Sequence, residues 1–423
     1  MKKSWRVWTV AFTLLTGMTL VSCTSTEPDS VVMQTPTEPA QEEGQTITII
    51  PTDQEKNGVD TTKYQIQTRL TDFHLFDGNS GIAWGVTRNA LRLYYTHDGG
   101  VTWTNISPSE NIPFPGELHY GTEILFADAQ NGWIVRQAWG SADTIVLRTS
   151  NGGETWNIAA LPDSGTVEGI HFTDASNGWI ASELAYSGRI LSRAIYRTTN
   201  GGASWSRQMT NPNVDGQVVN NVSELLPLMG EVTGIHFTDD EHGFVSINVN
   251  NRPRIYNTSD QGRSWAPSKA VETPNACSAP ENGAPQFRDI RDPDGWMPLQ
   301  CDKNGYISYS GYFTADGGRN HWQYAQLNLR VPTGMASTVP TFLNDRQGWV
   351  LVGPSVYYTE DGGKVWTSLG ANKVLLDMLE KYPEPVKMRF ASPKVGWLLI
   401  EKAEDRKSLL MQTIDGGRTW KVL

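Results

Sequence analysis

Residues 172–179 read Phe-Thr-Asp-Ala-Ser-Asn-Gly-Trp, and residues 198–205 read Thr-Thr-Asn-Gly-Gly-Ala-Ser-Trp. Together they form one unit, in which Phe-x-Asp and Gly-Trp are followed by Thr-x-Asn-x-Gly-x-x-Trp. Asp and Asn bond local backbone amides and Gly supplies positive φ, so both stretches predict tight turns between strands. The unit therefore predicts two hairpins, with strands at 169–172, 178–182, 194–197 and 205–208.

The second half of this unit recurs seven times along the chain. Its Asp or Asn residues are Asp98, Asn151, Asn200, Asp260, Asp316, Asp361 and Asp415. Its Trp residues are Trp103, Trp156, Trp205, Trp265, Trp322, Trp366 and Trp420, with spacings of 53, 49, 60, 57, 44 and 54 residues. Each spacing suits one propeller blade of four strands. We therefore expect an all-β, seven-bladed β-propeller of four-stranded antiparallel blades over residues 62–423.

The first half of the unit, Phe-x-Asp and Gly-Trp, recurs less strictly. Its Phe residues in blades 2 to 7 are Phe126, Phe172, Phe237, Phe287, Phe342 and Phe390. Blade 1 is the weakest copy, with Phe76, Asp77, Gly81 and a displaced Trp84. Twelve of the 16 Trp residues occupy one of the two motif positions, so the Trp excess is an effect of the repeat.

The Thr-x-Asp-x-Gly-x-x-Trp half resembles the Asp-box, or BNR, motif, and the resemblance covers about residues 62–423. The combined unit is most similar to the photosystem II assembly/stability-factor propeller family. Similar repeats occur in sortilin-type receptors, sialidases and xyloglucanases. The resemblance implies a binding or assembly module for another protein, with a photosystem II role only in a photosynthetic host.

The N-terminus has the pattern of an export signal. Lys2, Lys3 and Arg6 precede an uncharged apolar stretch that ends in Leu20-Val21-Ser22-Cys23. This ending resembles a bacterial lipobox, which predicts a lipoprotein signal peptide over residues 1–22 and lipidation of Cys23. A multiply acylated cysteine is a firm anchor. We therefore expect a membrane-anchored, extracytoplasmic lipoprotein on the bacterial cell surface or periplasmic side; the alternative is an ordinary secretory signal followed by a chance cysteine.

Residues 23–61 are rich in Thr, Glu, Pro and Gln and lack a periodic apolar pattern, apart from the run Ile47-Thr48-Ile49-Ile50. Such a composition buries too little apolar area to offset the entropy of ordering. It predicts a disordered tether between the anchor and the propeller. The alternative for the Ile47 run is docking on the propeller as an edge strand.

The net charge restricts the partners. The whole chain carries −10, and removing residues 1–22 removes three positive charges and no negative ones, which gives −13. A body this acidic is a poor match for nucleic acid or an anionic membrane surface. We expect contact with the membrane through the Cys23 lipid only, and no nucleic acid.

The repeated carboxylates are not predicted to be catalytic. Catalytic acids come as one pair in different environments, whereas these recur once per blade and two of the seven are Asn. The sequence contains no G-x-S-x-G, H-E-x-x-H, Cys-x-x-Cys or P-loop pattern. We expect structural Asp-boxes, no metal and no cofactor, and the sequence favours a non-enzymatic role without deciding it.

The predicted topology gives the propeller two different faces. If the Asp-box turns lie on one face, the long connections 106–120, 208–230, 267–286 and 367–386 share the other. Lengthened loops on one face favour binding there, although neutral insertion is the alternative. The last connection contains a predicted short amphipathic helix at 374–380. Candidate binding residues on the long-loop face are Trp139, Tyr186, Arg252 and Arg254. The alternative for Trp139 and Tyr186 is that they cover the rim.

Two cysteines remain after Cys23. Cys277 lies in the connection between blades 4 and 5, and Cys301 follows the second strand of blade 5. Both are expected on the long-loop face beside one blade. In an oxidising compartment they predict a Cys277–Cys301 disulfide, and two free thiols are the alternative.

Two functions follow for this chain. The first is a non-enzymatic binding or assembly module for a protein of the envelope or membrane, which contacts the long-loop face. The second is a carbohydrate-active propeller: a glycan hydrolase, a sialidase-like enzyme or a lectin. A hydrolase needs two carboxylates about 5–9 Å apart in a cleft.

Overall fold

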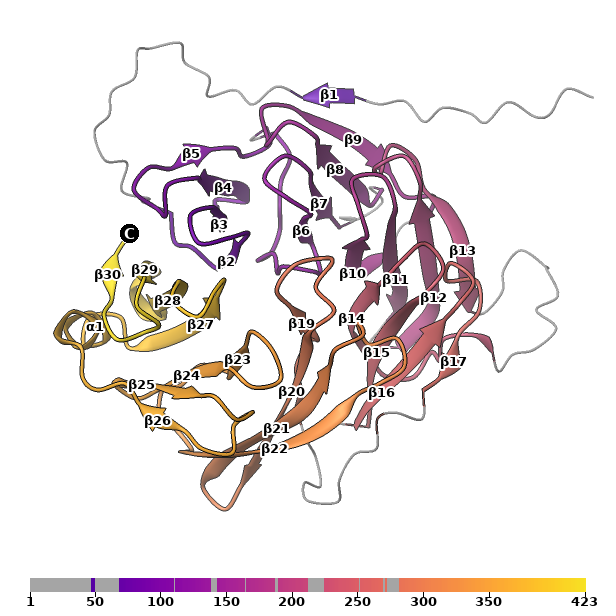
Figure 1. Cartoon of the computed structure of the whole chain (residues 1–423). Helices are drawn as coiled ribbons and strands as arrows, with labels where there is room; N and C mark the ends of the chain where they lie inside the picture. The colour runs from indigo at the N-terminus through magenta and orange to yellow at the C-terminus, as the bar shows by residue number, and fades with distance from the viewer. Residues whose placement is uncertain are drawn as a thin grey trace, which may run out of the picture. The chain divides into compact units, whose positions relative to one another are not determined.

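The computed structural model describes part of the chain, which belongs to the unit Glu43–Leu423. The described residues are 47–49, 68–109, 111–137, 143–163, 165–186, 189–211, 224–250, 252–268, 271 and 281–423. Their strands form seven antiparallel sheets that follow one another around a ring (Figure 1). The predicted seven-bladed propeller is confirmed.

Blades 1 to 4 each use four consecutive strands. Blade 1 contains β2 (Asp72–Leu75), β3 (Gly81–Thr87), β4 (Ala90–Thr96) and β5 (Thr104–Asn105). Blade 2 contains β6 (Ile124–Phe126), β7 (Gly132–Arg136), β8 (Ile145–Thr149) and β9 (Trp156–Ala160). Blade 3 contains β10 (Thr166–Phe172), β11 (Gly178–Tyr186), β12 (Arg189–Thr198) and β13 (Ser206–Asn211). Blade 4 contains β14 (Glu231–Phe237), β15 (Gly243–Val249), β16 (Arg252–Thr258) and β17 (Ala266–Pro267).

Blades 5 to 7 continue the ring. Blade 5 contains β18 (Glu281–Asn282), β19 (Gln286–Phe287), β20 (Gly295–Lys303), β21 (Tyr306–Thr314) and β22 (Gln323–Pro332). Blade 6 contains β23 (Thr341–Phe342), β24 (Gly348–Val352), β25 (Ser355–Thr359) and β26 (Thr367–Ser368). Blade 7 contains β27 (Glu384–Phe390), β28 (Gly396–Lys402), β29 (Lys407–Thr413) and β30 (Lys421–Val422), with a 3₁₀ turn at Ala403–Asp405.

Two further elements lie outside the repeat. α1 (Lys373–Leu379) confirms the helix expected in the connection before blade 7, and the Asn372 side chain caps its N-terminus. β1 (Ile47–Ile49) pairs antiparallel with β9 at the outer edge of blade 2, which is the docked alternative for the Ile47 run. No helix in the described part of the chain is long and apolar enough to cross a membrane.

The Phe-x-Asp and Gly-Trp motifs build the contacts between blades. In blade 3, Phe172 on the inner strand pairs in register with Gly178, and its ring stacks on Trp133 of blade 2 at 3.5 Å between centroids. Trp179 stacks on Phe237 of the next blade at 3.8 Å in the same way. These rings are fully buried, so the repeat supplies most of the apolar core between blades.

The Asp-box turns share one hydrogen-bond pattern. In blade 1 the Thr96 hydroxyl donates to the Asp98 carboxylate at 2.9 Å and accepts from the Gly100 amide at 2.9 Å. Asn151 takes the place of Asp98 in blade 2, where Thr149 donates to its side-chain oxygen at 2.9 Å. Between blades, the ring N–H groups of Trp133, Trp179 and Trp349 donate to the backbone carbonyls of Gly201, Gln261 and Gly416 at 2.8, 3.0 and 3.0 Å, so these three turns also bond a neighbouring blade.

The ring closes between blades 7 and 1 without an exchanged strand among the described residues, because each blade uses strands that are consecutive in sequence. Side chains join the two blades instead. Arg69 donates to Glu401 through Nε at 2.9 Å and Nη2 at 2.7 Å, and the Leu70 amide donates to the Ser408 hydroxyl at 2.6 Å.

Candidate binding site in the central cavity

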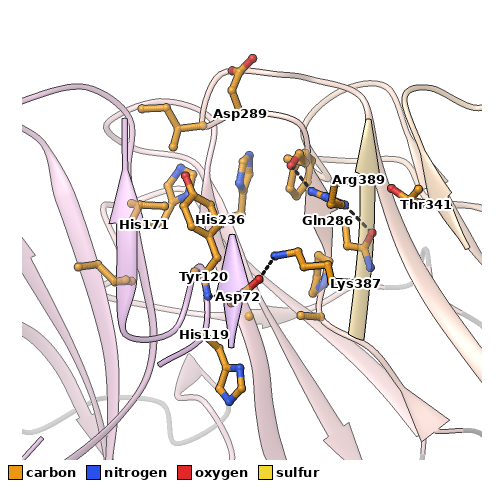
Figure 2. A pocket seen from close by; sticks show the side chains of 18 of the residues that line it. Asp72, His119, Tyr120, His171, His236, Gln286, Asp289, Thr341, Lys387 and Arg389 are labelled. Atoms are coloured by element: carbon orange, nitrogen blue, oxygen red, sulfur yellow. Dashed lines mark hydrogen bonds and ion pairs between the residues drawn. The ribbon is translucent and has the colours of Figure 1, made fainter. Parts of the chain in front are cut away.

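The inner strands of the blades surround a cavity of about 490 Å³ (Figure 2). This volume falls in the range of ligand sites in proteins, about 300–1,000 Å³. Residues from β2, β6, β10, β14, β15, β19, β23 and β27 line it, together with the segment before β6. In Figure 2, Asp289 stands at one end of the cavity and His119 at the other.

One position of the repeat supplies much of the lining. It is the residue immediately before the inner-strand Phe of each blade. From blade 2 to blade 7 the cavity-lining residues at this position are Leu125, His171, His236, Gln286, Thr341 and Arg389. The propeller therefore places chemically different side chains at equivalent places around the cavity.

A buried ion pair joins the first and last blades inside the cavity. The Lys387 ammonium lies 2.5 Å from an oxygen of Asp72 and also donates to the Phe73 carbonyl at 3.0 Å. The Asp72 carboxylate accepts two further bonds, from the backbone amides of Phe73 at 2.7 Å and Tyr120 at 3.2 Å. Burial lowers the pKa of Lys387, and the Asp72 charge opposes that shift. Each charge of the pair is thus matched by the other.

Arg389 is held by neutral acceptors. Its Nη1 donates to the Gln286 side-chain oxygen at 2.6 Å, and its Nη2 donates to the Phe287 carbonyl at 2.9 Å (Figure 2). Among the described residues, no carboxylate lies within ion-pair distance of this guanidinium. Burial lowers the pKa of Arg389, and the charges of Asp72 and Tyr120 act against that effect. A guanidinium nevertheless stays charged at any physiological pH.

The other carboxylates that line the cavity have cationic partners outside its lining. Glu117 pairs with Arg69 at 2.8 Å, and Asp289 with Arg288 at 3.7 Å. With Asp72 paired to Lys387, Arg389 is the charged lining group left without a counter-ion in the described part of the cavity. Arg69 also pairs with Glu401 at 2.7 Å and Arg288 with Asp292 at 3.0 Å, so Glu117 and Asp289 share their cations, and the described lining group that offers an unpaired positive charge is Arg389.

Neutral aromatic groups form the opposite wall. His171 and His236 lie 4.2 Å apart between ring centroids, and His236 stacks on Phe287 at 3.9 Å. The His171 Nε2 is 2.9 Å from the Phe237 carbonyl, so Nε2 carries the proton. Burial lowers the pKa of His171 to about 4 and that of His236 well below its ordinary value, with the His171 charge adding to the shift at His236. Both rings are neutral at pH 7.

The cavity opens beside an apolar lip on the long-loop face. Val339 and Val386 line the cavity and are 43% and 40% exposed. Val339 also lines a second, more open hollow with Met335, Pro383 and Pro385. Met335 is 44% exposed, so an apolar surface runs from the hollow to the cavity. Such contiguous exposed apolar side chains are typical of binding sites.

A group of acidic residues lies away from the cavity lining. Burial, reinforced by the neighbouring Glu183 charge, raises the pKa of Glu168 to about 7, while Arg193 opposes the shift. Glu183 pairs with the fully buried Arg193 at 3.0 Å. Burial also raises the pKa of Glu123. In the described residues, no group of three His, Cys, Asp or Glu side chains is arranged to hold a metal.

The candidate residues predicted from the sequence do not come together at the central cavity in the described part of the chain. Arg252 and Arg254 lie exposed at the start of β16 and do not line the cavity. Tyr186 is the last residue of β11 rather than part of a loop. Cys23, Trp139 and Cys277 lie outside the described residues. Cys301 lies within β20, which runs beyond its expected end, and is disulfide-bonded; its pairing with Cys277 remains a prediction.

The sequence reasoning missed Asp72, Lys387 and Arg389. A signal for Arg389 was present, because it stands directly before the inner-strand Phe390 in the repeat. Aligning that position across the blades would have identified His171, His236, Gln286, Thr341 and Arg389 as lining residues. Asp72 and Lys387 offered no such signal.

Comparison with known proteins supports the repeat-based resemblance. The family model of the photosynthesis system II assembly factor Ycf48 matches residues 52–224. The photosystem II assembly lipoprotein Ycf48 of Synechococcus sp. (strain CC9902) is 25% identical over 146 residues, which are 34% of this chain and 38% of that protein's length. The match thus spans well under two thirds of the relative.

Solved structures of Ycf48 are also similar. The structure of Ycf48 bound to a D1 peptide gives a TM-score of 0.48 at 19% identity and covers 88% of this chain and 97% of its own. Ycf48 from Cyanidioschyzon merolae gives 0.48 at 17% identity, with 83% and 98% covered. The chain is an Asp-box (BNR) propeller that resembles the photosystem II assembly-factor family.

Proposed function

We propose that this chain is a lipid-anchored, extracytoplasmic binding module that holds an extended segment of another envelope or membrane protein. The segment lies over the apolar lip at Met335, Val339 and Val386 and enters the central cavity. The observation that carries the proposal is the continuity of the lip with the cavity through Val339. The family-model match over residues 52–224 supports a binding role.

An extended chain suits this site better than a folded surface. The cavity is lined by residues of all seven blades, whereas the lip beside it is open. A peptide can place one end or one side chain in the cavity and lay its remaining apolar side chains on the lip. Burying each large apolar side chain contributes about 1.5–3 kcal/mol.

The test is capture of a partner by the full-length chain in its own cells, after in vivo crosslinking and identification by mass spectrometry. Val386→Asp and Val339→Asp place a charge on the lip and should abolish capture of the same protein. Val101→Asp is the matched control, because Val101 is 61% exposed on the Asp-box turn of blade 1. Equal capture by all three variants would contradict the site.

The earlier candidates give a second control. Arg252→Ala and Arg254→Ala change exposed residues of β16 that do not line the cavity. They should leave capture unchanged if the lip and cavity hold the partner. Loss of capture in these variants alone would move the binding surface to blade 4.

The proposal includes the lipid anchor and the extracytoplasmic location. They are supported by the lipobox ending in Cys23 and by the name of the Synechococcus relative, which is called a lipoprotein. Metabolic labelling with palmitate should mark the wild-type chain and not Cys23→Ser. Labelling of the Cys23→Ser variant, or none of the wild type, would contradict lipidation at Cys23. A photosystem II protein is the proposed partner only in a photosynthetic host.

One observation favours the carbohydrate-active alternative. Burial, reinforced by the Glu183 charge, raises the pKa of Glu168 to about 7, and a raised pKa of this kind is what a general acid needs. Hydrolysis of any polysaccharide in a panel by the wild-type chain, with loss of that activity in Glu168→Gln, would establish that function. If the chain neither hydrolyses nor binds any polysaccharide in the panel, the carbohydrate-active alternative is wrong.

A further inference from the structure

We propose that Arg389 binds a carboxylate group in the central cavity. The inference rests on the proposed function for the source of that carboxylate, a partner peptide. The site itself stands on the charges and contacts of the cavity.

The charge pattern identifies the sign of the ligand. The carboxylates of Asp72, Glu117 and Asp289 line the cavity and have cations at 2.5, 2.8 and 3.7 Å, although the cations of Glu117 and Asp289 each pair with a second carboxylate as well. Arg389 has no counter-ion among the described residues. An isolated buried charge is costly unless it is paired, so an anion that enters the cavity gains most by pairing with Arg389.

The geometry around Arg389 identifies the shape of the ligand. A guanidinium has five N–H donors, of which two are used by the Gln286 side chain and the Phe287 carbonyl. These bonds hold the plane of the group in place. A fixed guanidinium matches a planar carboxylate through two parallel N–H···O bonds.

The neighbouring groups restrict the ligand to a single negative charge. Lys387 is already neutralised by Asp72, so the cavity offers one free positive charge. His171 and His236 contribute none at neutral pH, and the remaining wall near them includes Ile170 and Ile235. A phosphate dianion would keep an unmatched charge in this apolar setting, whereas a carboxylate would not.

Defined peptides test the inference without an identified partner. The probes are fluorescein-labelled Ala-Leu-Ala-Val-Ala with a free C-terminal carboxylate, the same peptide as its C-terminal amide, and the amide with one Ala replaced by Glu. Fluorescence anisotropy measures their binding to the purified full-length chain. A charged hydrogen bond contributes about 1.5–3 kcal/mol, so the free acid should bind about 10- to 100-fold more tightly than the amide.

The pattern of binding identifies the source of the carboxylate. Tight binding of the free acid alone supports a peptide C-terminus, and tight binding of the Glu-containing amide as well supports an acidic side chain. Acetate that perturbs Arg389 in ¹⁵N spectra, without binding of any peptide, supports a small carboxylate ligand instead. Equal affinity for the acid and both amides, with no response to acetate, would overturn the inference.

Variants assign the effect to Arg389. Arg389→Gln should remove the preference for the free acid while the circular dichroism spectrum stays unchanged. Arg330→Gln is the matched control, because Arg330 is exposed on the outer strand β22. If Arg389→Gln does not fold, the acid-to-amide comparison and the acetate titration on the wild type still decide.

The two proposals fail separately. In one outcome, the chain prefers the free acid and the Val386→Asp variant still captures the partner. This result would support the carboxylate site and contradict the proposed function. Loss of capture in Val386→Asp without any preference for a carboxylate would keep the function and reject the role of Arg389.

Discussion

Each Asp-box turn depends on one side-chain oxygen. In blade 1, burial acts to raise the pKa of Asp98, but hydrogen bonds from Thr102 and Thr96 lower it to about 2. Asn151 and Asn200 receive the equivalent Thr bonds at 2.9 Å without a charge. The turn therefore needs the oxygen acceptor rather than the negative charge.

Asp98→Asn should consequently change stability at pH 7 by less than about 0.5 kcal/mol. A folded pKa below the ordinary value of 3.8 gives stability that is present above pH 3.8 and is lost as pH falls toward 2. The variant should lose less stability than wild type between pH 4 and 2, measured by denaturant unfolding. Asn151→Asp is the reciprocal control and should lose more; equal acid sensitivity in all three proteins would contradict this account.

The histidines of the cavity titrate in a different window. Burial lowers the pKa of His171 from 6.5 to about 4, so its stabilising effect is complete above pH 6.5 and is lost as pH falls through about 4. The shift corresponds to about 3 kcal/mol at pH 4. His171→Gln should flatten the fall in melting temperature between pH 6.5 and 4. His97→Gln, at an exposed position, should keep the wild-type profile, and a His171→Gln profile like wild type would refute the assignment.

Residue types in the turns could be predicted from sequence, whereas those in the cavity could not. The turn positions recur because every blade needs the same hydrogen bonds. Equivalent positions around the cavity carry chemically different side chains: Leu125, His171, Thr341 and Arg389. They differ because a cavity-lining side chain must only fit the available space, and no side-chain hydrogen bond is common to all the described residues there. A search for repeated residue types passes over such a position.

Within a blade, the inner strand and its neighbour are matched by a Phe opposite a Gly. A Cβ added at Gly178 would lie 2.5 Å from Phe172 ring carbons. The ring has no room to move away, because Trp133 of blade 2 stacks on it at 3.5 Å between centroids. The repeat keeps Gly before Trp for this close approach of the Phe ring.

Gly178→Ala should therefore destabilise the chain by about 1–3 kcal/mol, the usual cost of overpacking a core. Denaturant unfolding measures it. Gly116→Ala is the control, because a Cβ at Gly116 meets nothing within 4 Å. Combining Gly178→Ala with Phe172→Leu should recover part of the loss, and a neutral Gly178→Ala would show that the ring moves.

The order of the strands could be predicted from the repeat. The pairing register of the strands in blade 1, where the motif is weakest, could not. Blade 1 pairs Leu75 with Gly81, so Leu75 rather than Phe76 takes the inner-strand position. Ile82 then follows Gly81 at the position that Trp occupies in the Gly-Trp motif of most other blades. Trp84, two residues further along β3, is also buried. A motif search favours the aromatic residue, whereas the backbone pairing accepts any apolar side chain there.

The closed ring depends on contacts between residues far apart in sequence. Asp72 of blade 1 and Lys387 of blade 7 are separated by 315 positions. Their side chains are only 9% and 27% exposed. Removing one partner of such a pair leaves an uncompensated charge, which costs more than the pair itself contributes.

Lys387→Met should lower the free energy of unfolding by about 3 kcal/mol, since Asp72 keeps its two backbone bonds but loses its counter-ion. Adding Asp72→Leu removes the unpaired carboxylate, so the double variant should be more stable than Lys387→Met alone. A double-mutant cycle in denaturant unfolding gives the coupling, expected above about 1 kcal/mol. The exposed Lys373–Asp377 pair on α1 is the matched cycle and should couple much more weakly, because solvent screens exposed charges. Equal coupling in the two cycles would mean that the blades close on their apolar contacts, with Asp72 and Lys387 contributing no more than a surface ion pair.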